Sequence, residues 1–176
     1  IDEDEILVKV LGTGICAGDI KIVDGAQMFW GGGVLPKWVD EPVTLGHEFT
    51  GRVVAIGDRA REKYGLNLGD MAVAEQVIAC GECYFCQNGE HWMCVKTDIY
   101  GSKKKVAEGS MAEYMKYYRG SRVIKVPETI PERNTAMIEP LSCAVHTIER
   151  ADIKFKDVVV VAGLGPIGLC DLQLAM

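Results

Sequence analysis

The chain has 176 residues, of which 48% are hydrophobic and 25% are charged, so it can bury one substantial core as a globular rather than a disordered protein. The net charge of −6 at pH 7 argues against a nucleic-acid partner, because such proteins neutralise phosphates with an excess of Lys and Arg. Apolar stretches fall short of the about 18 residues needed to cross a membrane, so no membrane partner is expected.

Short strands are predicted along the first three quarters of the chain. Residues 5–10 alternate apolar and polar side chains, as a half-buried strand does. Val-rich segments over 51–56 and 70–76 are bounded by Gly-Asp pairs that favour turns. Two later segments, 112–117 and 122–126, are predicted to be strands as well. Together these segments indicate a compact β domain.

Two segments between the strands are predicted to be loops. Residues 25–38 are rich in glycine and hold Phe29, Trp30 and Trp38, whose rings either line a pocket or pin the loop. The run Lys103-Lys104-Lys105 is interpreted as a solvated loop.

The pattern becomes helical from Pro131, which is a favoured residue in the first turn of a helix. Because Pro140 cannot sit inside a continuous helix without losing a hydrogen bond, a break is predicted at Glu139-Pro140, with a second helix over 141–149. The apolar run 157–162 is predicted to be a buried strand. It leads into a glycine-rich turn at 163–168 and the start of an apolar helix.

Gly46-His47-Glu48 places an imidazole beside a carboxylate. The HExxH metalloprotease pattern is excluded, because Gly51 stands where its second histidine belongs. Alone, His47 would more often be a hydrogen-bonded structural histidine, and Cys16 a small buried apolar side chain. Together with a carboxylate, however, they form three protein ligands with an open fourth position, which is typical of catalytic zinc.

Asp19 follows Cys16 by three positions and admits two interpretations. It either hydrogen-bonds His47 and fixes its tautomer, or it caps a turn.

Seven cysteines are present, and four of them have the spacing C-x2-C-x2-C-x7-C, namely Cys80, Cys83, Cys86 and Cys94. Four thiolates at about 2.3 Å from one ion are what structural zinc requires, whereas two disulfides or a redox C-x-x-C pair are the alternatives. An odd total of cysteines, four of them clustered, fits metal binding in a reducing compartment better than paired disulfides, so a cytoplasmic location is predicted.

The turn Gly163-Leu164-Gly165-Pro166-Ile167-Gly168 has the GxGxxG pattern, which is weak evidence by itself. Its place between a predicted strand and a helix favours binding of a dinucleotide pyrophosphate at the helix N-terminus. The alternative is a tight strand-to-helix turn without a ligand.

The sequence resembles the zinc-dependent medium-chain alcohol and polyol dehydrogenases. The resemblance rests on motifs in the family's order: residues 14–19, residues 46–48, the four cysteines, Glu139-Pro140-Leu141 and the GxGxxG turn. The resemblance implies a mixed α/β fold. Residues 1–150 would form a GroES-like β domain with a structural-zinc lobe, and residues 151–176 the start of a Rossmann NAD(P)-binding domain. It further implies homodimers or homotetramers.

The activity that the resemblance implies is oxidation of an alcohol group of a small polyol to the ketone or aldehyde, with hydride transfer to NAD or NADP. Two zinc ions per subunit are implied: a catalytic one on Cys16 and His47, and a structural one on the four-cysteine group. The Glu139-Pro140-Leu141 pattern is similar to that of the sorbitol- or threitol-like polyol branch. In that branch either Glu48 or Glu139 completes the catalytic site. Nucleotide contacts fall on Gly163, Gly165, Pro166, Ile167 and Gly168.

Two departures from the family stand out. Gly18 and Lys21 occupy positions where the family usually has a Ser or Thr and often a His that relay the alcohol proton, so proton exit through water is expected. The interval from Cys16 to His47 is also longer than usual, so the aromatic loop is expected to shape a distinct pocket. L-threonine dehydrogenase activity is the main alternative, and a zinc-stabilised binding module without catalysis is a more distant one.

A Rossmann domain cannot consist of one strand and one helix opening, because a lone parallel strand lacks neighbours for its backbone and faces. The chain is therefore expected to be part of a longer protein. The acidic residue that distinguishes NAD from NADP would follow the glycines by about 20 positions, beyond Met176.

Overall fold

A computed structural model describes residues 1–102 and 105–176, which form two compact units, Ile1–Ala136 and Met137–Met176. The predicted mixed α/β class is confirmed. Of the predicted loop at Lys103-Lys104-Lys105, only the exposed Lys105 belongs to the described residues.

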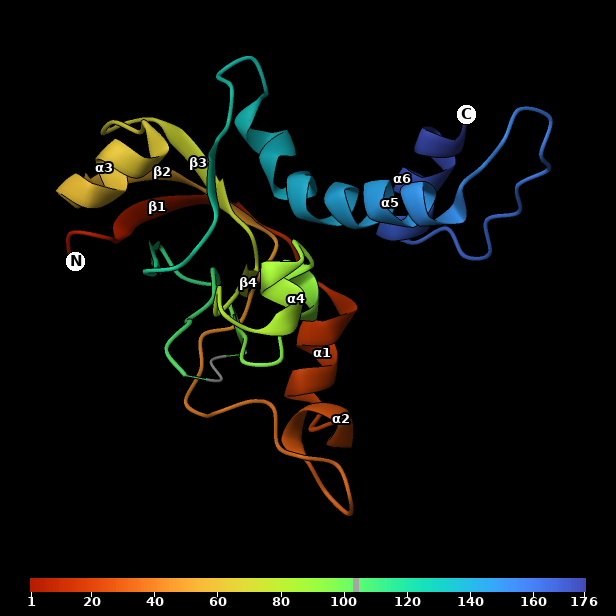
Figure 1. Cartoon of the computed structure of the whole chain (residues 1–176), viewed down its shortest axis with the longest axis horizontal. Coiled ribbons are helices and arrows are strands. Elements are labelled where there is room, and N and C mark those ends of the chain that lie inside the picture. The colour runs from red at the N-terminus through yellow and green to blue at the C-terminus, as the bar shows by residue number, and fades with distance from the viewer. Residues whose placement is uncertain (103–104) are drawn as a thin grey trace. The chain divides into compact units, whose positions relative to one another are not determined.

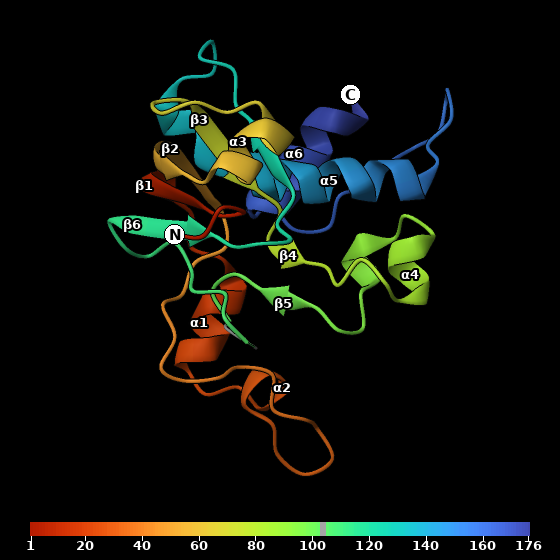
Figure 2. The same ribbon diagram turned by 60° about the vertical axis from the view of Figure 1, so that its left-hand side comes forward.

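The first unit is built on an antiparallel sheet (Figures 1 and 2). Its strand order is β6 (Tyr114–Tyr117), β1 (Ile6–Thr13), β2 (Phe49–Ile56), β3 (Met71–Ala74) and β7 (Val123–Lys125). The five strands predicted over the first three quarters of the chain are confirmed, with ends shifted by a few residues. The longest pairing joins β1 to β2, where Val8 lies opposite Val53 and Thr13 lies opposite Phe49. The end of this pairing positions the candidate site described below.

The core of this unit is closed by aromatic rings. Phe49 contacts Tyr100 and Tyr117, with ring centroids 5.2 and 5.5 Å apart. The buried hydroxyl groups find partners, because Tyr117 donates to the Ala72 carbonyl at 2.8 Å and Tyr100 lies 2.6 Å from the hydroxyl of Ser121. These rings therefore supply apolar packing, and their buried hydroxyl groups keep hydrogen-bond partners.

The sequence did not predict α1 (Ala17–Val23), α2 (Gln27–Trp30) or α3 (Asp58–Tyr64) of the first unit. The expectation of an irregular loop over 25–38 is wrong for α2, although the residues after it are irregular. Signals for α3 were present: Asp58 lies in its first turn, Arg61 and Lys63 lie in its last, and Gly65 ends it in the left-handed conformation with φ 62°.

The predicted cysteine-rich segment is bounded by a small two-stranded sheet of β4 (Val77–Ile78) and β5 (Asp98–Ile99). Between these strands lie two short helices, α4 (Tyr84–Gln87) and η1 (His91–Met93).

The predicted helix break is misplaced. A 3₁₀ helix at the end of the first unit, η2 (Glu132–Met137), is followed by a continuous α5 (Ile138–Ala151) in the second. Pro140 therefore lies in the first turn of α5, where its missing N–H would have had no helical partner, so no break is needed at Glu139-Pro140.

The predicted buried strand at 157–162 is also wrong. All six residues are described, and they form neither a paired strand nor a buried segment: the exposed fractions of Val158 and Val160 are 91% and 84%. A parallel strand needs neighbouring strands to satisfy its backbone and cover its faces, and the described part of this unit offers only α5 and α6 (Pro166–Ala175).

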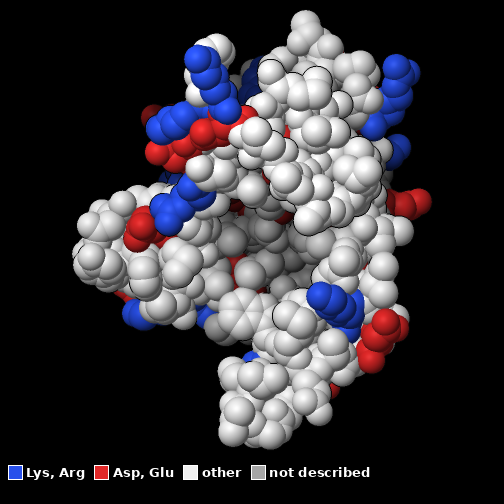
Figure 3. Space-filling model, turned by 90° about the vertical axis from the view of Figure 1, so that its right-hand side faces the viewer, with Lys and Arg blue, Asp and Glu red and all other residues white. Residues whose placement is uncertain are grey.

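Surface charges are paired locally. Arg59 contacts Glu3 and Asp4, and Lys96 lies 2.7 Å from Glu82. On the face shown in Figure 3, basic and acidic side chains lie in small adjacent groups on a mostly neutral surface. Exposed pairs of this kind contribute at most about 1 kcal/mol each. Within the described ranges, no helix is both long and apolar enough to cross a membrane.

The buried carboxylate of Asp98 is predicted to stabilise the fold of the first unit. It accepts backbone N–H groups from Ile99, Lys105, Val106 and Ala107 at 2.7 to 3.2 Å. In Asp98→Asn one acceptor oxygen becomes a donor that faces N–H groups, so the free energy of unfolding should fall by about 2–4 kcal/mol. Urea denaturation measures the change. The exposed Asp40→Asn is the control, and equal stability of the two variants would contradict this role for Asp98.

Candidate metal centres and nucleotide-binding turn

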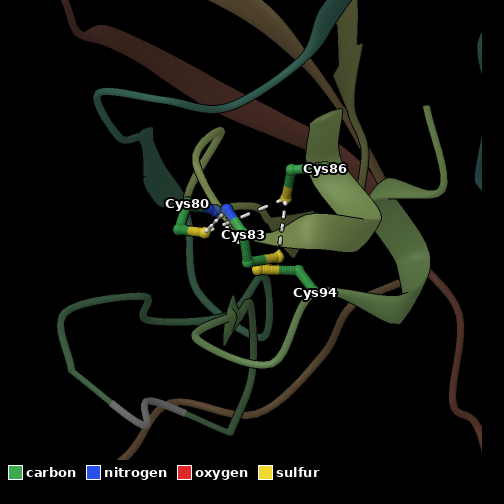
Figure 4. A group of neighbouring side chains, drawn as sticks. All are labelled: Cys80, Cys83, Cys86 and Cys94. Atoms are coloured by element: carbon green, nitrogen blue, oxygen red, sulfur yellow. Dashed lines mark hydrogen bonds between the residues drawn. The ribbon is translucent and has the colours of Figure 1, made fainter. Parts of the chain in front are cut away.

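The four cysteines of the predicted structural-zinc lobe converge on one point (Figure 4). These lobe cysteines are Cys80, Cys83, Cys86 and Cys94. Their sulfur atoms all lie within 4.8 Å of one another, with Cys83 and Cys86 at 3.5 Å and Cys80 and Cys86 at 3.9 Å. A tetrahedral zinc with Zn–S bonds of about 2.3 Å requires sulfur separations of about 3.8 Å. The thiols are not disulfide-bonded. The donor set and its spacing therefore fit one zinc ion.

Backbone dipoles prepare part of this group for ionisation. N–H groups of Cys86 and Val95 lower the pKa of the Cys83 thiol to about 6, and the N–H of Glu82 lowers the pKa of Cys80. Burial, together with the neighbouring Cys83 thiol, raises the pKa of Cys86 to about 12. A divalent cation would displace the remaining protons, since only thiolates bind zinc.

Cys16, His47 and Glu48 form the second group, and one ligand atom from each lies within 4.8 Å of the others. The pairing of β1 with β2 explains this convergence. The ladder ends at Thr13 and Phe49, and one further bond follows, from the Gly14 N–H to the Glu48 carbonyl at 2.7 Å. Glu48 and His47 directly precede β2, while Cys16 follows β1 and is the N-cap residue of α1. All three are partly exposed and hence accessible to a small ligand.

Asp19 lies near both of its predicted partners. One carboxylate oxygen accepts the Cys16 N–H at 2.9 Å, which caps α1, and the other lies 3.5 Å from Nδ1 of His47. Burial acts to raise the pKa of Asp19, but hydrogen bonds from His47 and from the backbone N–H groups of Cys16 and Gly46 lower it by more. An ionised Asp19 favours a proton on Nδ1 of His47 and leaves Nε2 for a metal.

Glycines that the sequence reasoning did not assign hold Glu48 and His47 in place. A Cβ on Gly14 would lie 1.9 Å from Oε2 of Glu48, so the carboxylate packs directly on the Gly14 backbone. Gly46 has φ 98°, and a Cβ there would lie 2.6 Å from the hydroxyl of Ser110. The signal for Gly14 was its place two residues before the candidate cysteine.

Glu139, the other candidate carboxylate, belongs to the second unit and lies in the first turn of α5. Its Oε1 accepts the thiol of Cys143, one helical turn later, at 3.6 Å. Cys143 is partly exposed. The i, i+4 spacing was the available signal for this contact.

The predicted glycine turn opens α6 within the second unit. Gly165 caps the helix and Pro166 lies in its first turn, while Gly163 has φ 102°. A Cβ on Gly168 would lie 1.9 Å from the Gly163 carbonyl, whereas Gly163 and Gly165 have no such neighbour within 4 Å. A cavity of about 810 Å³ lies along this turn. One glycine thus permits close packing and two leave room for a phosphate, which fits a dinucleotide.

Comparison with known proteins defines the class. The alcohol dehydrogenase GroES-like domain matches residues 2–128, so the chain belongs to that family. The chain is 48% identical over 165 residues to the erythritol/L-threitol dehydrogenase of Mycolicibacterium smegmatis, covering 94% of this chain and 45% of that protein. It is 35% identical over 172 residues to a sorbitol dehydrogenase of Halalkalibacterium halodurans, covering 97% and 45%.

A solved structure covers both units. It is of a protein described as a zinc-binding dehydrogenase from Sinorhizobium meliloti 1021, bound to NADP, with a TM-score of 0.84 and 33% identity over 99% of this chain and 46% of that one. The chain thus spans about half the length of the relatives it matches. The predicted resemblance and fold class are confirmed, whereas the roles of individual residues and the domain boundary at 150 stay predictions.

Removing a lobe cysteine tests the four-sulfur group. Cys86→Ala should remove one zinc ion per chain and destabilise the protein strongly, because structural zinc contributes on the order of 10 kcal/mol to folding. Elemental analysis and thermal denaturation measure the two effects. Tyr84→Ala, an exposed change on the same short helix α4, is the control. Unchanged zinc content in Cys86→Ala would contradict the assignment.

Adding one methyl group beside Glu48 tests the second group. Gly14→Ala should displace the Glu48 carboxylate and weaken the zinc affinity of this group by about 10- to 100-fold. Gly18→Ala is a matched control, because its Cβ would meet Cys16, His47 and Phe29 only at ordinary contact distances of 3.7 to 4.0 Å. Competition with a chelating dye measures the affinity, and equal values for both variants would exclude the proposed role of Gly14.

Proposed function

We propose that the protein to which this chain belongs is a zinc-dependent dehydrogenase that oxidises an alcohol group of a short polyol, with hydride transfer to NAD or NADP. The observation that carries the proposal is the convergence of Cys16, His47 and Glu48 beside the end of β1 and β2. The 48% identity to an erythritol/L-threitol dehydrogenase supports a four-carbon polyol as substrate.

Cys16, His47 and Glu48 would hold the catalytic ion. Their donor set carries two negative charges, which balance a divalent cation, and three protein ligands leave a position for substrate. When bound, zinc supplies a Lewis acid that favours loss of a proton from an alcohol. Glu48 lies in one group with Cys16 and His47, which supports Glu48 as the third ligand.

The other residues orient the reactants and move the proton. Asp19 holds the His47 ring through Nδ1, at 3.5 Å. We assign Glu139 to accept a hydrogen bond from the substrate hydroxyl, with the Cys143 thiol fixing one of its oxygens. Because Gly18 has no hydroxyl, we propose that the proton leaves through water. The N-terminus of α6, with Gly163, Gly165, Pro166, Ile167 and Gly168, would bind the nucleotide pyrophosphate.

L-threonine is the alternative substrate, because L-threonine dehydrogenases share most of these motifs. We further propose a cytoplasmic protein that forms a homodimer or homotetramer. The seven thiols without disulfides support a reducing compartment.

Substitution of the catalytic ligands tests this function on the full-length protein. Cys16→Ala and His47→Ala should each lower the zinc content from two ions per chain to one and abolish turnover of erythritol, threitol and L-threonine, because the metal no longer has three protein ligands. Elemental analysis and NAD(P)H absorbance measure these effects.

His91→Ala is the control, because this histidine lies in η1, outside both ligand groups. It should keep two zinc ions and full activity. Near-normal turnover in Cys16→Ala would overturn the proposal. Turnover of L-threonine but of no polyol would instead favour the alternative substrate.

A further inference from the structure

The aromatic ring of Phe29 reaches the candidate catalytic group from α2. A Cβ placed on Gly18 would lie 3.7 Å from Sγ of Cys16, 3.9 Å from Cε1 of His47 and 4.0 Å from Cζ of Phe29. These three atoms therefore surround one small space, which the absence of a side chain at Gly18 leaves open. Two of its sides carry metal-binding groups, and the third is the tip of an apolar ring.

The backbone that carries the ring is held by hydrogen bonds at the C-terminal end of α2. The backbone carbonyl of Phe29 accepts the N–H groups of Trp38 and Val39 at 2.7 and 3.0 Å, and Val39 is fully buried. Trp30, next in the helix, donates its indole N–H to the Ile22 carbonyl of α1 at 2.7 Å. A one-turn helix would not keep its shape by itself, so the Trp30 bond fixes α2 against α1, and the other two fix it to the segment at 38–39. The backbone of Phe29 is thus held in place beside the candidate catalytic group.

An apolar ring at this place suits the carbon skeleton of a substrate and not its hydroxyl groups. A hydroxyl that packs against the ring would lose its water without gaining a hydrogen-bond partner, which weakens binding. A polyol carries a hydroxyl on every carbon, so each added carbon brings another polar group that must avoid the ring. The ring is therefore expected to discriminate between polyols mainly by the length of their carbon chain.

We propose that Phe29 sets the length of polyol that the site accepts, by closing the space beside Cys16 and Gly18 to chains longer than four carbons. This inference rests on the proposed function, since it concerns the same site. It accounts for the aromatic loop, which the chemistry of the metal ligands leaves unexplained. It also gives Gly18 a role, because the missing side chain makes the room that Phe29 then limits.

The test compares kcat/KM for erythritol, with four carbons, and sorbitol, with six, in the full-length protein. Phe29→Ala should raise the sorbitol to erythritol ratio about tenfold or more, because pocket volume discriminates between chain lengths on this scale. Phe29→Leu should give an intermediate ratio. Gly18→Ala fills the same space and should lower the ratio instead. Dissociation constants of both polyols, from the visible spectrum of the Co(II)-substituted protein, give a second readout that does not depend on turnover.

Met28→Ala is the matched control, because Met28 lies on the same short helix with 59% of its surface exposed. It should leave the ratio unchanged, and thermal denaturation should show all four variants to be folded. If the unmodified protein turns over polyols while Phe29→Ala keeps the original ratio, the role of Phe29 is overturned and the proposed function stands. If the unmodified protein neither binds nor oxidises any polyol, both are overturned.

Discussion

The antiparallel pairing of β1 with β2 is the constraint on which the candidate catalytic group depends. Cys16 and His47 are far apart in sequence, and the long segment between them could close in many ways. The ladder from Ile6 and Ile56 to Thr13 and Phe49 fixes the two chain ends, and the bond from Gly14 to Glu48 extends it by one step. The hydrogen bonds of the sheet thus bring the two ends of this long segment together. The entropy cost of closing the loop does not have to be met by the metal ligands.

Close backbone packing then fixes the ligand-bearing turn from the other side. A Cβ on Gly101 or Gly109 would lie under 3.0 Å from the backbone of Leu45 and Gly46, so these segments touch main chain to main chain. Backbone N–H groups of Gly109, Ser110 and Met111 donate to residues 44–46. His47 therefore follows a turn that is bonded on one side to a remote loop and leads on the other into β2. Little freedom remains for the imidazole beyond its own rotamers.

Sequence reasoning succeeded where the determinants are local and failed where they are tertiary. The four lobe cysteines lie within one short segment, so spacing alone predicted their convergence. Bringing together Cys16, His47 and Glu48 depends on strand pairing. The residue types suggested a site of one cysteine, one histidine and a carboxylate, and the family resemblance named Glu48 as one of two candidate carboxylates. The segment 157–162 looked like a strand because its composition is that of a buried parallel strand. Composition, however, cannot supply the neighbouring strands that such a conformation requires. Phe29 was noticed as an aromatic residue, but its place beside Gly18 follows from bonds to Trp38 and Val39 that no local pattern encodes.

The two metal groups therefore differ in what holds them together. In the lobe, the short helices α4 and η1 are too small to be stable alone, so binding of an ion by four thiolates is expected to supply much of the lobe's stability. In the second group, the ligands stand at the ends of strands whose hydrogen bonds and core form without a metal. Because folding does not depend on a fourth protein ligand there, that position can stay open to substrate. A metal site with an open coordination position needs its three protein ligands to be held by the surrounding fold. The end of β1 and β2 holds them in this way.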